Sequence, residues 1–150
     1  DTQTPEMLNA WRPDYKIWKK EFERYDLTPD TLLVGHSCGG GFLVRWLSEN
    51  KKAQVGKVIL VAPWTDPDNA YTASTGFFDF QIDPKISDRC REIVIFISDD
   101  DQEDILDTVN IIKKTVINNI RIREFERYGH FIPDHMKTDK FPELLDEILS

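Results

Sequence analysis

Four short apolar runs divide the chain, and each has the length and composition of a β-strand. They are residues 31–34, 56–62, 92–98 and 120–125. The second run is apolar almost without interruption, which is typical of a strand covered by helices on both faces of a parallel sheet. The fourth run alternates apolar and charged residues, which indicates a strand near a sheet edge.

Helical periodicity fills the segments around these runs. An apolar stripe predicts a helix over 13–25 that faces the core: Tyr15, Trp18, Phe22 and Tyr25. Further helices are expected from 42 to about 48, over 105–116 and over 141–149, the last with an apolar face of Leu144, Leu145 and Ile148. Strands that alternate with helices predict an α/β fold, with a parallel sheet sandwiched by helices.

The segment 64–88 breaks this alternation. It follows the second strand and is rich in aromatic, Asp, Pro and Gly residues. A long irregular segment in a compact domain is typical of a functional or mobile loop. We therefore expect it to form part of a pocket wall and to be more mobile than the sheet. An equally weighted alternative is that its aromatic side chains pin the loop to the core.

A Gly-x-Ser-x-Gly motif lies between the first strand and the helix that follows it. It reads Gly35-His36-Ser37-Cys38-Gly39. On a strand–turn–helix this pattern is a nucleophile elbow, which exposes the serine hydroxyl. Gly35 and Gly39 lack Cβ atoms, so we expect strand and helix to approach closely there. The alternative is a glycine-rich turn that contains a serine by chance.

Two more groups with useful chemistry follow strands. The aspartates 99–101 follow the third strand, and His130 follows the fourth. Functional groups in open α/β sheets gather beyond the carboxyl ends of the strands, and the order Ser, Asp, His is that of α/β hydrolases. His130 can take the proton of Ser37, while an aspartate orients the imidazole.

Three motifs together resemble a known family. They are Gly35-His36-Ser37-x-Gly39, the turn 98–101 and Tyr128-Gly129-His130-Phe131. The chain is similar, from about Thr4 onward, to α/β-hydrolase superfamily enzymes, and most of all to small serine hydrolases of the retinoblastoma-binding-protein-9/YdeN type. The resemblance implies Ser37 as nucleophile and His130 as base.

The resemblance also bears on the acid of the triad. The family turn reads Ser-x-Asp-Asp and its second aspartate is the acid, which implies Asp101, with Asp100 as the runner-up because three aspartates are consecutive. His36 is interpreted as structural, and His135 as a surface residue. The backbone N–H of Cys38 is the expected oxyanion donor.

One part of the family pattern has no counterpart in the sequence. The family has a strand before the elbow strand, and the loop after it supplies a second oxyanion amide. No glycine precedes Gly35 and no β-like run precedes Thr31. We therefore expect residues 1–150 to be a single α/β-hydrolase domain that begins inside the fold and lacks roughly forty residues. One missing oxyanion donor lowers rates about a hundred- to a thousandfold.

Composition excludes several classes of partner and site. The net charge of −8 argues against nucleic-acid binding, and no apolar run is long enough to span a membrane. Two cysteines without a pattern suit a cytoplasmic protein. Neither they nor the three histidines have metal-ligand spacing, so we expect no metal and no cofactor.

The leading hypothesis is a cytoplasmic serine hydrolase that cleaves a small ester, thioester or amide of an acyl substrate through an acyl-enzyme. A second hypothesis is a catalytically weak or inactive hydrolase-fold module that binds a protein partner through the aromatic segment 64–88. A flavodoxin-like binding domain is a weaker third, because no phosphate-binding glycine loop is present.

Overall fold

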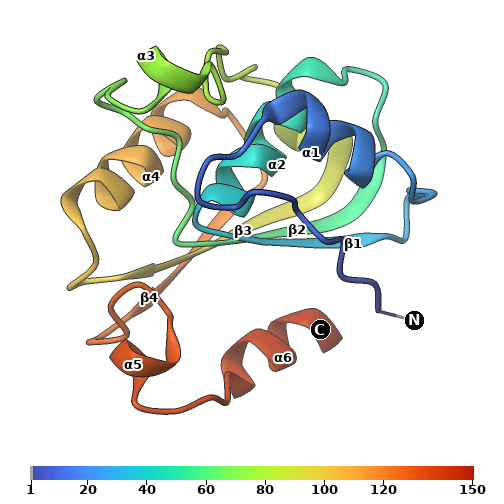
Figure 1. The fold of residues 1–150 in the computed structure, drawn as a ribbon. Coiled ribbons are helices and arrows are strands. Elements are labelled where there is room, and N and C mark those ends of the chain that lie inside the picture. Colours follow the sequence, from blue (N-terminus) through green and yellow to red (C-terminus); the bar gives the residue numbers. More distant parts are fainter. Residues whose placement is uncertain (1) are drawn as a thin grey trace.

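A parallel sheet of four strands forms the centre of the molecule (Figure 1). The computed structural model describes residues 2–150, so the predicted domain 1–150 includes one residue, Asp1, that lies outside the described part. The strands stand in the order β1 (Leu32–His36), β2 (Val55–Val61), β3 (Cys90–Ser98) and β4 (Ile120–Phe125). All four predicted strands are confirmed, and β4 lies at an edge as its alternating pattern indicated.

Helices cover both faces of this sheet, which confirms the α/β fold. Figure 1 shows α1 (Tyr15–Phe22), α2 (Cys38–Glu49) and α4 (Glu103–Thr115) on one face, with α5 (Pro133–Met136) and α6 (Pro142–Leu149) on the other. The short helices α3 (Thr72–Thr75) and η1 (Ile86–Arg89) lie between β2 and β3 in sequence. Within residues 2–150, no helix combines the length and the apolar character needed to cross a membrane.

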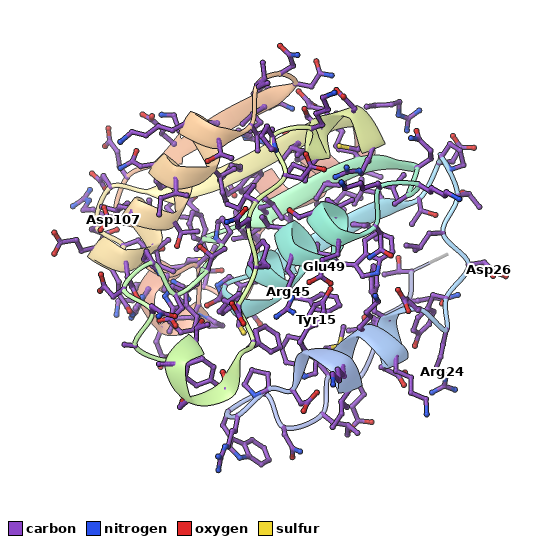
Figure 2. The ribbon with its side chains drawn as sticks, turned by 90° about the horizontal axis from the view of Figure 1, so that it is seen from above. Tyr15, Arg24, Asp26, Arg45, Glu49 and Asp107 are labelled. Atoms are coloured by element: carbon purple, nitrogen blue, oxygen red, sulfur yellow. The ribbon has the colours of Figure 1, made fainter. Side chains whose placement is uncertain are left out.

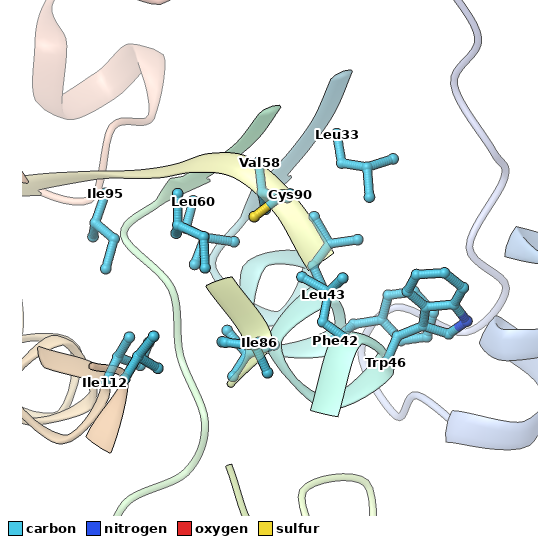
Figure 3. Packing of buried hydrophobic residues seen from close by; sticks show 14 of the residues in the cluster. Leu33, Phe42, Leu43, Trp46, Val58, Leu60, Ile86, Cys90, Ile95 and Ile112 are labelled. Atoms are coloured by element: carbon cyan, nitrogen blue, oxygen red, sulfur yellow. The ribbon is translucent and has the colours of Figure 1, made fainter. Parts of the chain in front are cut away.

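The strands divide their side chains between two hydrophobic clusters. In β2, Val58 and Leu60 pack under α1 and α2, whereas Ile59 and Val61 face the opposite cluster. Figure 3 shows Val58 and Leu60 on the same side as Phe42 of α2. This alternation buries both faces of the central strands, which explains the continuous apolar run in the sequence.

Helix α1 is shorter than the stripe predicted. Asp14 accepts hydrogen bonds through Oδ1 from the backbone N–H groups of Lys16 (2.8 Å) and Ile17 (3.1 Å), so the helix begins after this N-cap rather than at Pro13. It ends at Phe22, before Tyr25. The rest of the stripe is confirmed, because Tyr15, Trp18 and Phe22 are buried.

The predicted apolar face of α6 is largely wrong. Leu145 and Ile148 are exposed, and the buried residue of this helix is Glu147. The reason lies in β4, whose Arg121 and Arg123 point toward α6 and donate hydrogen bonds to the Glu147 carboxylate. The alternation of β4 therefore determines that α6 presents a charged residue to the sheet.

The segment 64–88 is held to the core by its aromatic residues. Phe77 is fully buried and Phe78 is nearly so, and Phe77 makes an edge contact with Trp18. Arg45 of α2 donates hydrogen bonds to the carbonyl groups of Gly76 (2.8 Å) and Phe77 (2.5 Å). The alternative that the aromatic residues pin the loop is confirmed.

The guanidinium group of Arg45 also joins α2 to α1. It lies 3.6 Å from the centre of the Tyr15 ring and pairs with Glu49, which in turn accepts a hydrogen bond from the Tyr15 hydroxyl (2.7 Å). Figure 2 shows these three side chains together between the two helices. Burial and the nearby Glu49 carboxylate raise the pKa of Tyr15, so its hydroxyl remains a donor.

Candidate active site

Ser37 occupies a strained turn between β1 and α2. Its backbone has φ 51° and ψ −120°, a conformation that is uncommon for a residue with a side chain. Three backbone hydrogen bonds fix it: Ser37 N–H donates to the Val61 carbonyl (2.9 Å), and the Ser37 carbonyl accepts from Gly41 (3.1 Å) and Trp64 (3.0 Å). These bonds therefore hold the backbone of Ser37 in this conformation.

Of the two glycines predicted to allow a close approach at this turn, one does so and the other does not. A Cβ on Gly35 would lie 2.7 Å from the Gly39 carbonyl oxygen, so the close approach of strand and helix does require Gly35. A Cβ on Gly39 would meet nothing within 4 Å, so the expectation for this residue is wrong. The crowded glycine of the helix is Gly41, whose Cβ would overlap the Trp64 carbonyl group.

The structure brings Ser37, His130 and Asp101 together from the ends of three strands. Ser37 Oγ lies 2.9 Å from His130 Nε2, and His130 Nδ1 lies 3.0 Å from Asp101 Oδ1 and 3.3 Å from Oδ2. The Asp101 side chain is 0% exposed and that of His130 is 16% exposed. A carboxylate can only accept, so Nδ1 carries the proton and Nε2 is free to accept from the serine hydroxyl.

Asp100 has a different set of contacts. Its Oδ1 accepts hydrogen bonds from Ser98 Oγ (2.7 Å) and from the backbone N–H of Gly129 (2.8 Å). These two bonds lower the pKa of Asp100. Ser98 Oγ also accepts from the backbone N–H of Tyr128 (2.9 Å). Asp100 and Ser98 thus link the loop after β3 to the loop that carries His130, a role that sequence reasoning missed.

The amino end of α2 faces the serine. No acceptor for the backbone N–H of Cys38 is found within residues 2–150, so this group is available to a developing negative charge at the start of the helix. Burial raises the pKa of the Cys38 thiol to about 12. The thiol is therefore protonated at neutral pH, the form in which a cysteine is a poor nucleophile.

A pocket of about 370 Å³ adjoins Ser37 and Cys38. Its other walls are mainly apolar and come from the amino-terminal segment, α1, β1 and α2. They include Met7, Trp18, Phe22, His36, Phe42 and Leu43. None of its lining residues belongs to 64–88, contrary to the expectation that this segment forms the pocket wall.

The two other histidines both contact the backbone of His130. His36 Nε2 lies 2.8 Å from the His130 carbonyl oxygen, and His135 Nδ1 accepts from the His130 N–H at 2.9 Å. His135 is exposed, as expected of a surface residue. Sequence spacing gave no signal for either contact. Over the described residues, no cluster of three or more His, Cys, Asp or Glu side chains could hold a metal ion.

Comparison with known proteins fits this arrangement. A family model described as serine hydrolase matches residues 2–131, which include the elbow, the aspartates after β3 and His130. The chain belongs to the serine hydrolase family. The match covers the loop after β3 and the loop that carries His130, but it does not extend to α6. A comparison with curated proteins found no significant match.

Two solved structures show the same fold as this serine hydrolase. The ydeN gene product of B. subtilis superposes with a TM-score of 0.77 at 24% identity, over 96% of this chain and 78% of that one. Naproxen esterase (carboxylesterase NP) from Bacillus subtilis gives a TM-score of 0.55 at 14% identity, over 99% and 68% respectively. These likenesses show that the sheet and its covering helices have the α/β-hydrolase fold.

Proposed function

We propose that this serine hydrolase cleaves a small ester, thioester or amide through an acyl-enzyme formed on Ser37. The observation that carries the proposal is the continuous path from Ser37 Oγ to His130 Nε2 (2.9 Å) and from His130 Nδ1 to Asp101 (3.0 Å). Both distances suit proton transfer and orientation of the ring. Asp100 is the weaker candidate for the acid because it bonds the loop backbone instead of the ring.

Each residue then has a defined step. Ser37 Oγ attacks the acyl carbon while His130 Nε2 takes its proton, and Asp101 stabilises the imidazolium. The Cys38 N–H donates to the oxyanion. His130 returns the proton to the departing alcohol, thiol or amine, which leaves the acyl group on Ser37. A water molecule then attacks the acyl-enzyme ester while His130 Nε2 takes its proton, and this proton passes to Ser37 Oγ as the carboxylic acid leaves.

The pocket supports an apolar acyl or leaving group. Trp18, Phe22, Phe42 and Leu43 offer aromatic and aliphatic surface beside Ser37, and burial of apolar surface would contribute about 25 cal/mol per Å² to binding. We therefore propose esters with short apolar acyl chains as substrates.

Hydrolysis of p-nitrophenyl esters tests the proposal. The wild type should release p-nitrophenol, faster from the butyrate than from the acetate if the pocket holds the acyl chain. Ser37→Ala should lose this turnover, whereas Ser74→Ala, which changes an exposed serine of α3, should keep it. Equal turnover by wild type and Ser37→Ala would refute the function. No turnover by the wild type on any ester, thioester or amide would favour the binding-module alternative.

A further inference from the structure

The backbone N–H and the backbone carbonyl group of His130 each contact a histidine ring. The N–H donates to His135 Nδ1 (2.9 Å), and the carbonyl oxygen lies 2.8 Å from His36 Nε2. These are all three histidines of the chain. They come from separate places: His36 ends β1, His130 follows β4, and His135 lies in α5.

The chemistry of these contacts fixes where the protons lie. A backbone N–H can only donate, so His135 Nδ1 must be unprotonated and its proton must sit on Nε2. A carbonyl oxygen can only accept, so His36 Nε2 must carry a proton. Burial lowers the pKa of His36, and its hydrogen bond to His130 opposes this only in part. Each contact is thus satisfied by the neutral form of its histidine that carries the proton on Nε2.

The loop between β4 and α5 needs such support. Arg127 (φ 57°), Gly129 (φ 52°) and Phe131 (φ 54°) all have left-handed backbone within five residues. Backbone of this kind persists where surrounding contacts determine it. The His135 ring packs closely on Gly129, because a Cβ there would lie 2.5 Å from Nδ1. The position of His130 relative to Ser37 therefore depends on contacts from outside the loop.

We infer that His36 and His135 are positioning residues, which hold the His130 backbone so that its ring meets both Ser37 and Asp101. The inference rests on the proposed hydrolase function. Neither histidine touches the reacting atoms in this scheme, so loss of either contact should lower kcat. KM should stay nearly unchanged in the His135 variants, whereas His36 also lines the pocket, so its variants are judged by kcat alone.

Paired substitutions separate the hydrogen bond from the bulk of the ring. His135→Asn keeps an acceptor at the place of Nδ1, and His135→Leu removes it. His36→Gln keeps a donor at the place of Nε2, and His36→Leu removes it. Asp134→Asn, an exposed change in α5, is the matched control. Thermal unfolding of each variant shows whether it is folded.

We expect each Leu variant to lose about tenfold to a hundredfold in kcat, the usual effect of a small misplacement of a reacting group. The amide variants should recover most of that loss. In the His135 variants, KM should stay within about twofold of the wild-type value, because His135 is not among the pocket's lining residues. Leu variants as fast as the wild type, or amide variants as slow as the Leu variants, would overturn the inference.

A nitrogen-15 NMR spectrum of histidine-labelled wild type tests the contacts without activity. At about pH 8.5, where histidine is neutral, His135 and His36 should both show the Nε2–H tautomer and His130 the Nδ1–H tautomer. An Nδ1–H tautomer at His135 would overturn the inference. The expected tautomers in a wild type without turnover would support the contacts and refute only the hydrolase function.

Discussion

Glu147 gives the sharpest stability prediction. Its side chain is 4% exposed and accepts hydrogen bonds from Lys57 Nζ (3.1 Å), an Arg121 nitrogen (2.6 Å) and an Arg123 nitrogen (3.2 Å). Glu147→Gln keeps the shape of the side chain and removes its charge. The three cationic side chains then face a neutral amide, so part of their positive charge is no longer compensated where α6 packs on the sheet.

The magnitude follows from the pKa of Glu147. Burial alone would raise this pKa, but hydrogen bonds from Arg121 and Lys57 outweigh it and lower the value from 4.5 to about 2. That difference corresponds to about 3 kcal/mol of stability at neutral pH. Because the Arg121 side chain is 43% exposed, solvent screening reduces the expected value to about 2 kcal/mol.

The sign of the pH dependence follows from the lowered pKa. The stabilisation is fully present above the unfolded-state pKa of 4.5 and is lost as pH falls toward about 2. Urea unfolding of wild type and Glu147→Gln should therefore differ by about 2 kcal/mol at pH 7 and by less than half of that at about pH 3. Asp146→Asn, an exposed change on the same helix, should stay within about 0.5 kcal/mol of wild type. Equal stability at pH 7, or a difference that does not change with pH, would refute the reasoning.

Two further pairs of variants test the elbow and the acid. Gly41→Ala should destabilise the fold by at least about 3 kcal/mol in urea unfolding, because its Cβ would overlap the Trp64 carbonyl group. Gly39→Ala should be neutral or stabilise the fold by up to about 1 kcal/mol, since nothing lies near the added Cβ. A Gly39→Ala variant less stable than Gly41→Ala would contradict these two predictions. Asp101→Asn should lower kcat about ten-thousandfold by favouring the wrong imidazole tautomer. Asp100→Asn should cost at most about a hundredfold, and a larger loss than that of Asp101→Asn would reverse the assignment of the acid.

Much of the fold could be predicted from sequence because its signals are local. The four strands are marked by apolar runs, and the alternation of β4 indicated an edge strand. Ser37 stands directly after β1 and His130 lies in the loop that follows β4, so chain order alone places both at the same edge of a parallel sheet. The choice between Asp100 and Asp101 depends on which carboxylate turns toward the ring, and a run of three aspartates does not encode this.

Other features depend on contacts between distant segments and had no local signal. Leu145 and Ile148 have the right spacing for a core face, but the arginines of β4 draw Glu147 inward instead. The crowding of Gly41 arises from Trp64, which lies beyond the next strand. The contacts of His36 and His135 with His130 likewise form only when the loops meet.

Covalent labelling of Ser37 is the most direct test of the hydrolase account. Trypsin should release residues 25–45 as one peptide, and Ser37 is its only serine. We predict that a fluorophosphonate probe adds once to the folded wild type, that the added mass lies on this peptide, and that Ser37→Ala and heat-unfolded protein stay unlabelled. Labelling that persists in Ser37→Ala, or a folded wild type that the probe does not modify, would contradict the assignment of Ser37 as an activated nucleophile.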